Sequence, residues 1–185
     1  MGELEAEFEA CLDPLDERGH VSKLRRLGIP DRVIYGPRSL VGVARIMPCT
    51  SGFFEFHEYG EKALVIAEGE PAVPGWSLIE DLVAFQPGNP CRWWLRRGAV
   101  QLLGEHNLRS WKLGETVLHA TPLDWLQSGG EGVCVLDWKL DPSVLLYGTG
   151  AGLVADSAAL KAKLLDRVQE AAVEPWKIEV AHASA

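Results

Sequence analysis

The chain has 185 residues, a net charge of −8, and 47% hydrophobic and 24% charged residues. This composition is typical of a soluble globular protein with one packed domain. The sequence has no run near the roughly 20 apolar residues that cross a bilayer, and its acidic start lacks the features of a signal peptide. We therefore expect a soluble cytoplasmic protein with no membrane partner.

Charge is unevenly distributed along the chain. Residues 1–17 carry seven acidic and no basic residues, whereas residues 18–45 carry seven basic residues and one acidic residue. Two interpretations follow. The acidic segment folds against basic residues of its own or a neighbouring chain, or the basic segment binds a polyanion and the acidic segment competes for it. The acidic total disfavours a dedicated nucleic-acid-binding protein.

The first elements are predicted to be short helices. Leu4, Phe8 and Leu12 are spaced four residues apart, which indicates a helix over residues 3–12. A second helix is expected from Ser22, a good N-cap, to Leu27. Residues 1–38 are thus predicted to form an N-terminal helical arm, and exchange of this arm between two chains would give a homodimer.

The next segment has the pattern of antiparallel strands. Strands are predicted over residues 40–47, 53–59 and 63–67, and a fourth over residues 82–85 within 76–86. Gly60-Glu61 suits a two-residue turn that would join the second and third strands as a hairpin. We therefore expect an antiparallel meander over about residues 40–86.

The predicted hairpin suggests a chemical site. Its register would place Glu55, His57 and Glu68 on one face of the sheet. An imidazole with two carboxylates is a set that binds a divalent metal or works as an acid–base pair, so these residues are the candidate catalytic and metal-binding residues. The other interpretation is a solvated strand face.

Residues 64–70, LVIAEGE, resemble the strand and Glu-Gly start of Toprim domains. In that family the glutamate works with a later DxD pair to hold Mg²⁺ for phosphoryl transfer. The resemblance covers seven residues, and the later acidic strand end carries Asp137 without the second aspartate. The chain is therefore not assigned to the family.

A helix is predicted over residues 92–103, which begin RWWLRR. Cations next to aromatic residues can neutralise phosphates and stack bases. The candidate polyanion-binding residues are Arg25, Arg26, Arg92, Arg96 and Arg97. In the alternative interpretation the tryptophans are core residues, and the arginines lie on a solvated face or pair with the acids of residues 1–17.

The C-terminal part is predicted to mix helices and strands. Short strands are expected over residues 116–119, 132–138 and 144–147, and Thr121 is expected to cap a helix that ends at Gly129-Gly130. A last helix should run from Asp156 or Ser157 to about residue 172. The four cysteines form no CxxC pair, which disfavours a zinc ribbon, and we expect buried free thiols.

The predicted fold is α+β, with the meander packed against a mixed α/β C-terminal half and a terminal helix in a single domain over residues 39–180. The leading functional hypothesis is a non-enzymatic binding or accessory module of a cytoplasmic protein or nucleic-acid complex. The alternative is a metal-dependent hydrolase or phosphoryl-transfer enzyme that uses Glu55, His57 and Glu68. The sequence leaves open whether the protein is an enzyme, and it identifies no cofactor beyond this divalent metal.

Overall fold

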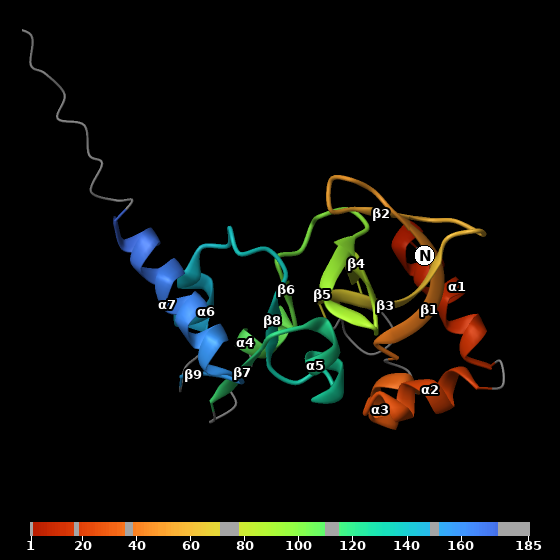
Figure 1. Cartoon of the computed structure of the whole chain (residues 1–185), viewed down its shortest axis with the longest axis horizontal. Coiled ribbons are helices and arrows are strands. Elements are labelled where there is room, and N and C mark those ends of the chain that lie inside the picture. Colours follow the sequence, from red (N-terminus) through yellow and green to blue (C-terminus); the bar gives the residue numbers. More distant parts are fainter. Residues whose placement is uncertain are drawn as a thin grey trace, which may run out of the picture.

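The computed structural model describes residues 2–16, 19–35, 39–70, 78–109, 115–148 and 152–173. It has the predicted α+β fold, with an antiparallel sheet and a second, mixed sheet (Figure 1). A 3₁₀ helix, Asp13–Asp16, follows the first α-helix. The α-helices are α1 (Glu3–Leu12), α2 (His20–Arg26), α3 (Asp31–Ile34), α4 (Glu105–Arg109), α5 (Pro122–Gln127), α6 (Pro142–Gly148) and α7 (Ala158–Val173). The strands are β1 (Val41–Pro48), β2 (Phe54–Phe56), β3 (Glu61–Glu70), β4 (Leu78–Gln86), β5 (Asn89–Leu95), β6 (Leu102–Leu103), β7 (Thr116–His119), β8 (Val133–Val135) and β9 (Leu153–Ala155).

The first sheet has the strand order β2-β1-β3-β4-β5 and is antiparallel throughout. Strands β1, β3, β4 and β5 follow one another as a meander, which includes β5 beyond the predicted residues 40–86 and leaves β2 at the outer edge. The predicted hairpin of β2 with β3 is wrong, because β1 lies between them and Glu55 pairs with Met47. Strand β3 is a long apolar strand that needs long partners on both sides, and the three residues of β2 are too few to cover it.

The first sheet curls until its two outer strands meet. Phe53, just before β2, forms a bridge with Leu95 at the end of β5, and the Leu95 amide donates to the Gly52 carbonyl at 3.0 Å. The strands at the two ends of the sheet are therefore joined at this point, which shortens the free edges.

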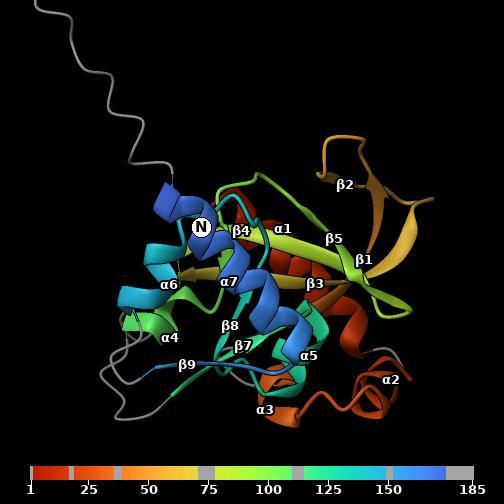
Figure 2. The same cartoon turned by 60° about the vertical axis from the view of Figure 1, so that its left-hand side comes forward.

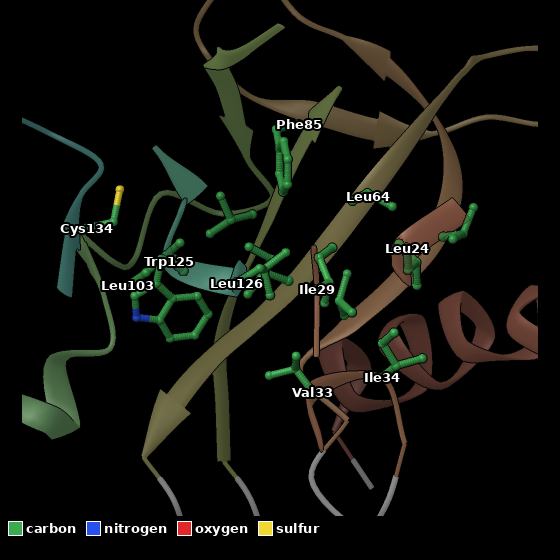
Figure 3. Packing of buried hydrophobic residues seen from close by; sticks show 14 of the residues in the cluster. Leu24, Ile29, Val33, Ile34, Leu64, Phe85, Leu103, Trp125, Leu126 and Cys134 are labelled. Carbon is green, nitrogen blue, oxygen red and sulfur yellow. The ribbon is translucent and has the colours of Figure 1, made fainter. Parts of the chain in front are cut away.

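Two apolar layers cover the two faces of this sheet. Helix α1 packs on one face, while α2, α3, α5 and part of the second sheet pack on the other. Figure 3 shows the second layer, in which Trp125 and Leu126 of α5 lie between the strands of the two sheets. The N-terminal helices therefore contribute to the same apolar clusters as the sheet.

Residues 92–95 form part of a strand, so the helix predicted over residues 92–103 is wrong. Trp93 packs in the layer under α5, whereas Trp94 packs in the layer under α1. Neighbouring side chains that enter opposite layers have the period of a strand. The tryptophans are core residues, as one of the two interpretations predicts.

The second sheet has the order β6-β8-β7-β9, in which β7 is parallel to both β8 and β9. Helix α5 packs on the face that carries Cys134, and α6 and α7 pack on the face that carries Val133 and Val135 (Figure 2). The short strands predicted over residues 116–119 and within 132–138 are confirmed. The strand predicted over residues 144–147 is wrong, because Asp141 accepts a hydrogen bond from the Ser143 amide and starts α6.

Helix ends follow local chemistry at most of the predicted positions, but α2 begins at His20 after Gly19 and not at the predicted cap Ser22. The Thr121 hydroxyl accepts the Asp124 amide of α5 at 3.2 Å, and the Ser157 hydroxyl accepts the Leu160 amide of α7 at 3.2 Å. Gly28 ends α2 with φ of 79°, a conformation that suits glycine. Predicted helices over residues 3–12, 122–128 and 158–172 are thus confirmed.

All four cysteines are free thiols. Cys11 and Cys134 are buried as predicted, and burial raises the pKa of the Cys11 thiol to about 12. Cys91 is exposed and Cys49 is partly exposed, so the prediction fails for these two.

Among the described residues, no helix has the length and apolar character needed to cross a membrane.

Candidate functional site

The structure does not bring Glu55, His57 and Glu68 together. Glu55 pairs with Met47 of β1. Continuing the register in which Val41 pairs with Ile66 places Glu68 opposite Ser39. Ser39 and Met47 are eight residues apart in sequence. At about 3.3 Å per residue this separation is on the order of 25 Å. Within the described ranges there is no group of three His, Cys, Asp or Glu residues that could hold a metal ion.

Glu55 and His57 lie in the solvent at the open end of the sheet. Both side chains are exposed, and the His57 Nδ1 accepts a hydrogen bond from the Tyr59 amide at 3.2 Å. The same end carries three exposed apolar side chains, and we call Met47, Phe53, Glu55, His57 and Tyr59 the β1–β2 surface. Met47 is 47%, Phe53 37% and Tyr59 81% exposed. The Tyr59 ring lies 5.9 Å from the His57 ring.

Glu68 is a buried carboxyl group at the contact between the two sheets. Its side chain is 5% exposed, its Oε2 accepts the Gly104 amide at 2.9 Å, and its Oε1 lies 4.0 Å from Nδ1 of His106 on α4. Burial raises the pKa of Glu68 to about 7, although hydrogen bonds from the backbone amides of Gly104 and Glu105 act in the opposite direction. The partner imidazole of Glu68 is therefore His106, which the sequence analysis did not single out.

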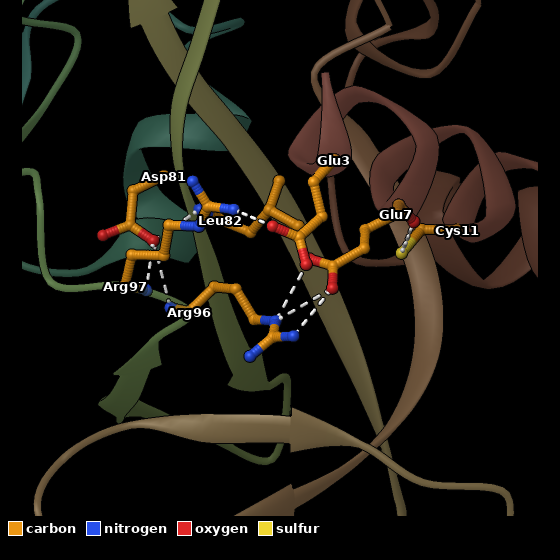
Figure 4. Close-up of polar contacts among 7 residues, drawn as sticks. All are labelled: Glu3, Glu7, Cys11, Asp81, Leu82, Arg96 and Arg97. Atoms are coloured by element: carbon orange, nitrogen blue, oxygen red, sulfur yellow. Dashed lines mark hydrogen bonds and ion pairs between the residues drawn. The ribbon is translucent and has the colours of Figure 1, made fainter. Parts of the chain in front are cut away.

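A second buried carboxylate, Asp81, lies opposite Glu68 on β4. Its side chain is fully buried, so its charge needs hydrogen-bond donors within the protein. Four backbone amides supply them, from Leu82 at 2.8 Å, Arg96 at 3.1 Å, Arg97 at 2.8 Å and Ala99 at 2.7 Å. Asp81 thus fixes the turn that follows β5 (Figure 4).

The side chains of this turn hold α1. The Arg96 guanidinium binds both carboxylate oxygens of Glu7, at 2.7 Å through Nη2 and 3.1 Å through Nε, and Arg97 pairs with Glu3 (Figure 4). Glu5 accepts the Ile79 amide of β4 at 3.1 Å, which lowers the pKa of Glu5. The interpretation in which arginines of residues 92–97 pair with the acids of residues 1–17 is therefore confirmed for Arg96 and Arg97.

The other three arginines of the predicted polyanion set also contact their own chain. Arg25 makes a two-pronged contact with Asp31, at 2.8 and 2.9 Å. The Arg26 Nε donates to the Ser22 carbonyl, and the Arg92 guanidinium lies 5.2 Å from the Trp94 ring centre. The five residues therefore come from α2 and from the end of β5, and most of their charge is matched within the chain.

A histidine–aspartate pair lies at the carboxyl ends of β7 and β9. Ligands of open α/β sheets bind at such ends, where the following helices lie on opposite faces. His119 is 3.9 Å from Asp156 through Nδ1, and its Nε2 donates to the Glu131 carbonyl at 3.1 Å. Because both ring nitrogens face acceptors of the same chain, the ring joins β7, β9 and the loop before β8.

Comparisons with known proteins do not place this chain in a family. No family model, curated protein or solved structure matches it. The assignment of function therefore depends on the physical features of the chain alone.

The sequence pattern around Asp81 indicates that this side chain is buried. Asp81, Val83 and Phe85 alternate along β4, and the two apolar residues face the layer under α5. An aspartate in register with them faces the same layer and needs buried donors. For His106 we find no comparable signal, since it approaches Glu68 only through the packing of α4 on β3.

Asp81→Asn should lower the free energy of unfolding by about 3 kcal/mol. The asparagine side chain has a single acceptor oxygen and no negative charge, so it cannot accept hydrogen bonds from all four amides. Asp137→Asn is the matched control, since Asp137 accepts the Lys139 amide at a partly exposed position and should cost less than about 1 kcal/mol. Urea unfolding followed by circular dichroism measures both. Equal losses in the two variants would contradict the role of Asp81.

The pKa of Glu68 is raised from its ordinary value of 4.5 to about 7 in the folded protein. We therefore expect Glu68 to lower the free energy of unfolding as pH rises from 4.5 to about 7. In this window the folded protein keeps a proton that the unfolded chain releases. Glu68→Gln should remove this fall and stabilise the protein at pH 8, by up to about 3 kcal/mol. Unfolding free energies at pH 5 and pH 8 test this, with Glu58→Gln, an exposed glutamate between β2 and β3, as the control. An unchanged pH dependence in Glu68→Gln would refute it.

Proposed function

We propose that the protein is a non-enzymatic binding module, that it acts as an accessory component of a cytoplasmic complex, and that its partner there is a protein. The observation that carries this proposal is the β1–β2 surface. Tyr59 is 81% exposed, its backbone amide donates to His57 Nδ1, and its ring lies 5.9 Å from the His57 ring. Exposed aromatic and methionine side chains that lie together are typical of protein-binding surfaces.

The charge distribution favours a protein over a nucleic acid as the partner. A nucleic-acid site presents unpaired cations to phosphates. Here Arg25, Arg96 and Arg97 each face a carboxylate of the same chain, and the net charge is −8. Polyanion binding by these arginines would have to break the ion pairs first.

The rim of the β1–β2 surface indicates the charge of the partner. Three exposed acids, Glu55, Glu58 and Glu61, outnumber the two exposed bases of this region, Arg45 and Lys62. A partner surface with an apolar centre and a basic rim would be complementary in both shape and charge. The same complementarity disfavours two copies of this face as partners, because it would bring these acids together.

Photo-crosslinking in the producing cells tests the surface. With p-benzoylphenylalanine at position 59, we expect one defined adduct that Met47→Asp in the same chain reduces at least tenfold. Position 35 is the matched control, since Tyr35 is also exposed but lies after α3. An adduct that forms equally at both positions, or no adduct at position 59, would contradict the proposal. An adduct of twice the chain mass would identify self-association instead.

A nucleic-acid partner in place of a protein would give a different result in a heparin-binding experiment. Glu3→Gln with Glu7→Gln removes both acids that pair with Arg96 and Arg97, so retention on heparin at low salt should rise if these arginines form a polyanion site. Glu9→Gln with Asp13→Asn removes two exposed acids of the same N-terminal segment and therefore matches the change in net charge. We expect equal, weak retention of both variants. Selective retention of the Glu3/Glu7 variant would favour a polyanion partner.

A further inference from the structure

We infer that the sheet face under α1 is a docking site for an acidic amphipathic helix of a partner protein, and that α1 occupies this site in the free chain. This site is separate from the β1–β2 surface and does not depend on it. Helix α1 would then inhibit binding until a partner helix replaces it.

The face has an apolar surface that accepts a helix. Leu4, Phe8 and Cys11 of α1 are buried in it. The sheet residues of this layer are Ile46, Phe54, Ala63, Val65, Leu82, Ala84 and Trp94. Gly42 allows the closest approach, because a Cβ atom there would lie 2.6 Å from Cβ of Cys11 and 2.7 Å from its carbonyl oxygen.

Two cations at the rim of this face select an acidic helix. Arg96 and Arg97 bind Glu7 and Glu3, which are four residues apart on one side of α1. Asp81 holds the backbone of both arginines through their amides, independently of α1. The backbone from which both arginine side chains extend is therefore held by the sheet and not by α1.

Helix α1 by itself is a weak occupant. Glu3 and Glu7, and likewise Glu5 and Glu9, are like charges at spacing four, which destabilises a helix. The helix has no side-chain hydrogen bond at its N-cap and no basic residue in its last turn, and only the acids of its first turn favour the helix dipole. A ten-residue helix of this kind depends on its contacts with the sheet.

The pattern of α1 defines the chemistry of the partner. The partner helix would carry acids at positions i and i+4 and apolar residues at i+1, i+5 and i+8, as Glu3, Glu7, Leu4, Phe8 and Cys11 do. A helix with this pattern and a better N-cap would compete with α1 through the same contacts.

A fluorescent peptide of residues 2–16 tests the site on the full-length protein. We expect micromolar binding to the variant Glu3→Arg/Glu7→Arg, in which α1 is repelled by Arg96 and Arg97, and at least tenfold weaker binding to the wild type. Adding Arg96→Glu/Arg97→Glu to that variant should abolish binding. Adding Arg92→Glu should not, since Arg92 lies on β5 but pairs with no acid of α1. Fluorescence anisotropy measures all four proteins.

Hydrogen exchange of the wild type decides the question if the arginine variants fail to fold. We expect α1 amides to exchange at least tenfold faster than those of β3, through a local opening that releases the helix. The inference would be overturned if the α1 amides exchanged only as fast as those of β3. It would also be overturned if the Glu3→Arg/Glu7→Arg variant folded but did not bind the peptide. A wild-type dimer that Glu3→Arg/Glu7→Arg dissolves would also overturn it, because the occupant would then be a second copy of the chain.

Discussion

The position of one buried carboxylate, Asp81, determines how the N-terminal helix meets the sheet. A fully buried charge is tolerated only when donors surround it, and Asp81 obtains four of them from the backbone. Three of these amides belong to the turn after β5, so the turn cannot move without leaving the charge unpaired. The arginine side chains of that turn then point to the acids of α1 (Figure 4).

Glu68 and Asp81 show how differently two buried carboxyl groups are solvated. They face each other across β3 and β4, and opposed residues of an antiparallel pair have Cβ atoms about 5 Å apart. Asp81 accepts four backbone amides, whereas Glu68 is supported by the amides of Gly104 and Glu105 and by a distant imidazole. Burial raises the pKa of Glu68, and its two backbone amides offset this effect only in part.

Local signals in the sequence were sufficient for much of the fold. The caps Thr121 and Ser157 and the stripe of Leu160 and Leu164 on α7 predicted helices that the structure confirms. The failures depend on contacts between distant residues. Trp93 and Trp94 enter different layers, and β2 pairs outside β1, neither of which a local pattern encodes. The candidate site residues show the same dependence on distant contacts. The pairing of Arg96 and Arg97 with the acids of α1 was predicted only as one of two alternatives, and His106 was not predicted as the neighbour of Glu68.

The ion pairs of α1 also determine when the chain can complete this layer. Glu7 and Arg96 are 89 residues apart in sequence, and Glu3 and Arg97 are 94 apart. Contacts of such separation form late, because a long loop must close before they contribute. During synthesis from the N-terminus, the first helix therefore leaves the ribosome long before its counter-charges exist. The apolar side of that segment must stay in contact with water or a chaperone until the whole first sheet has emerged.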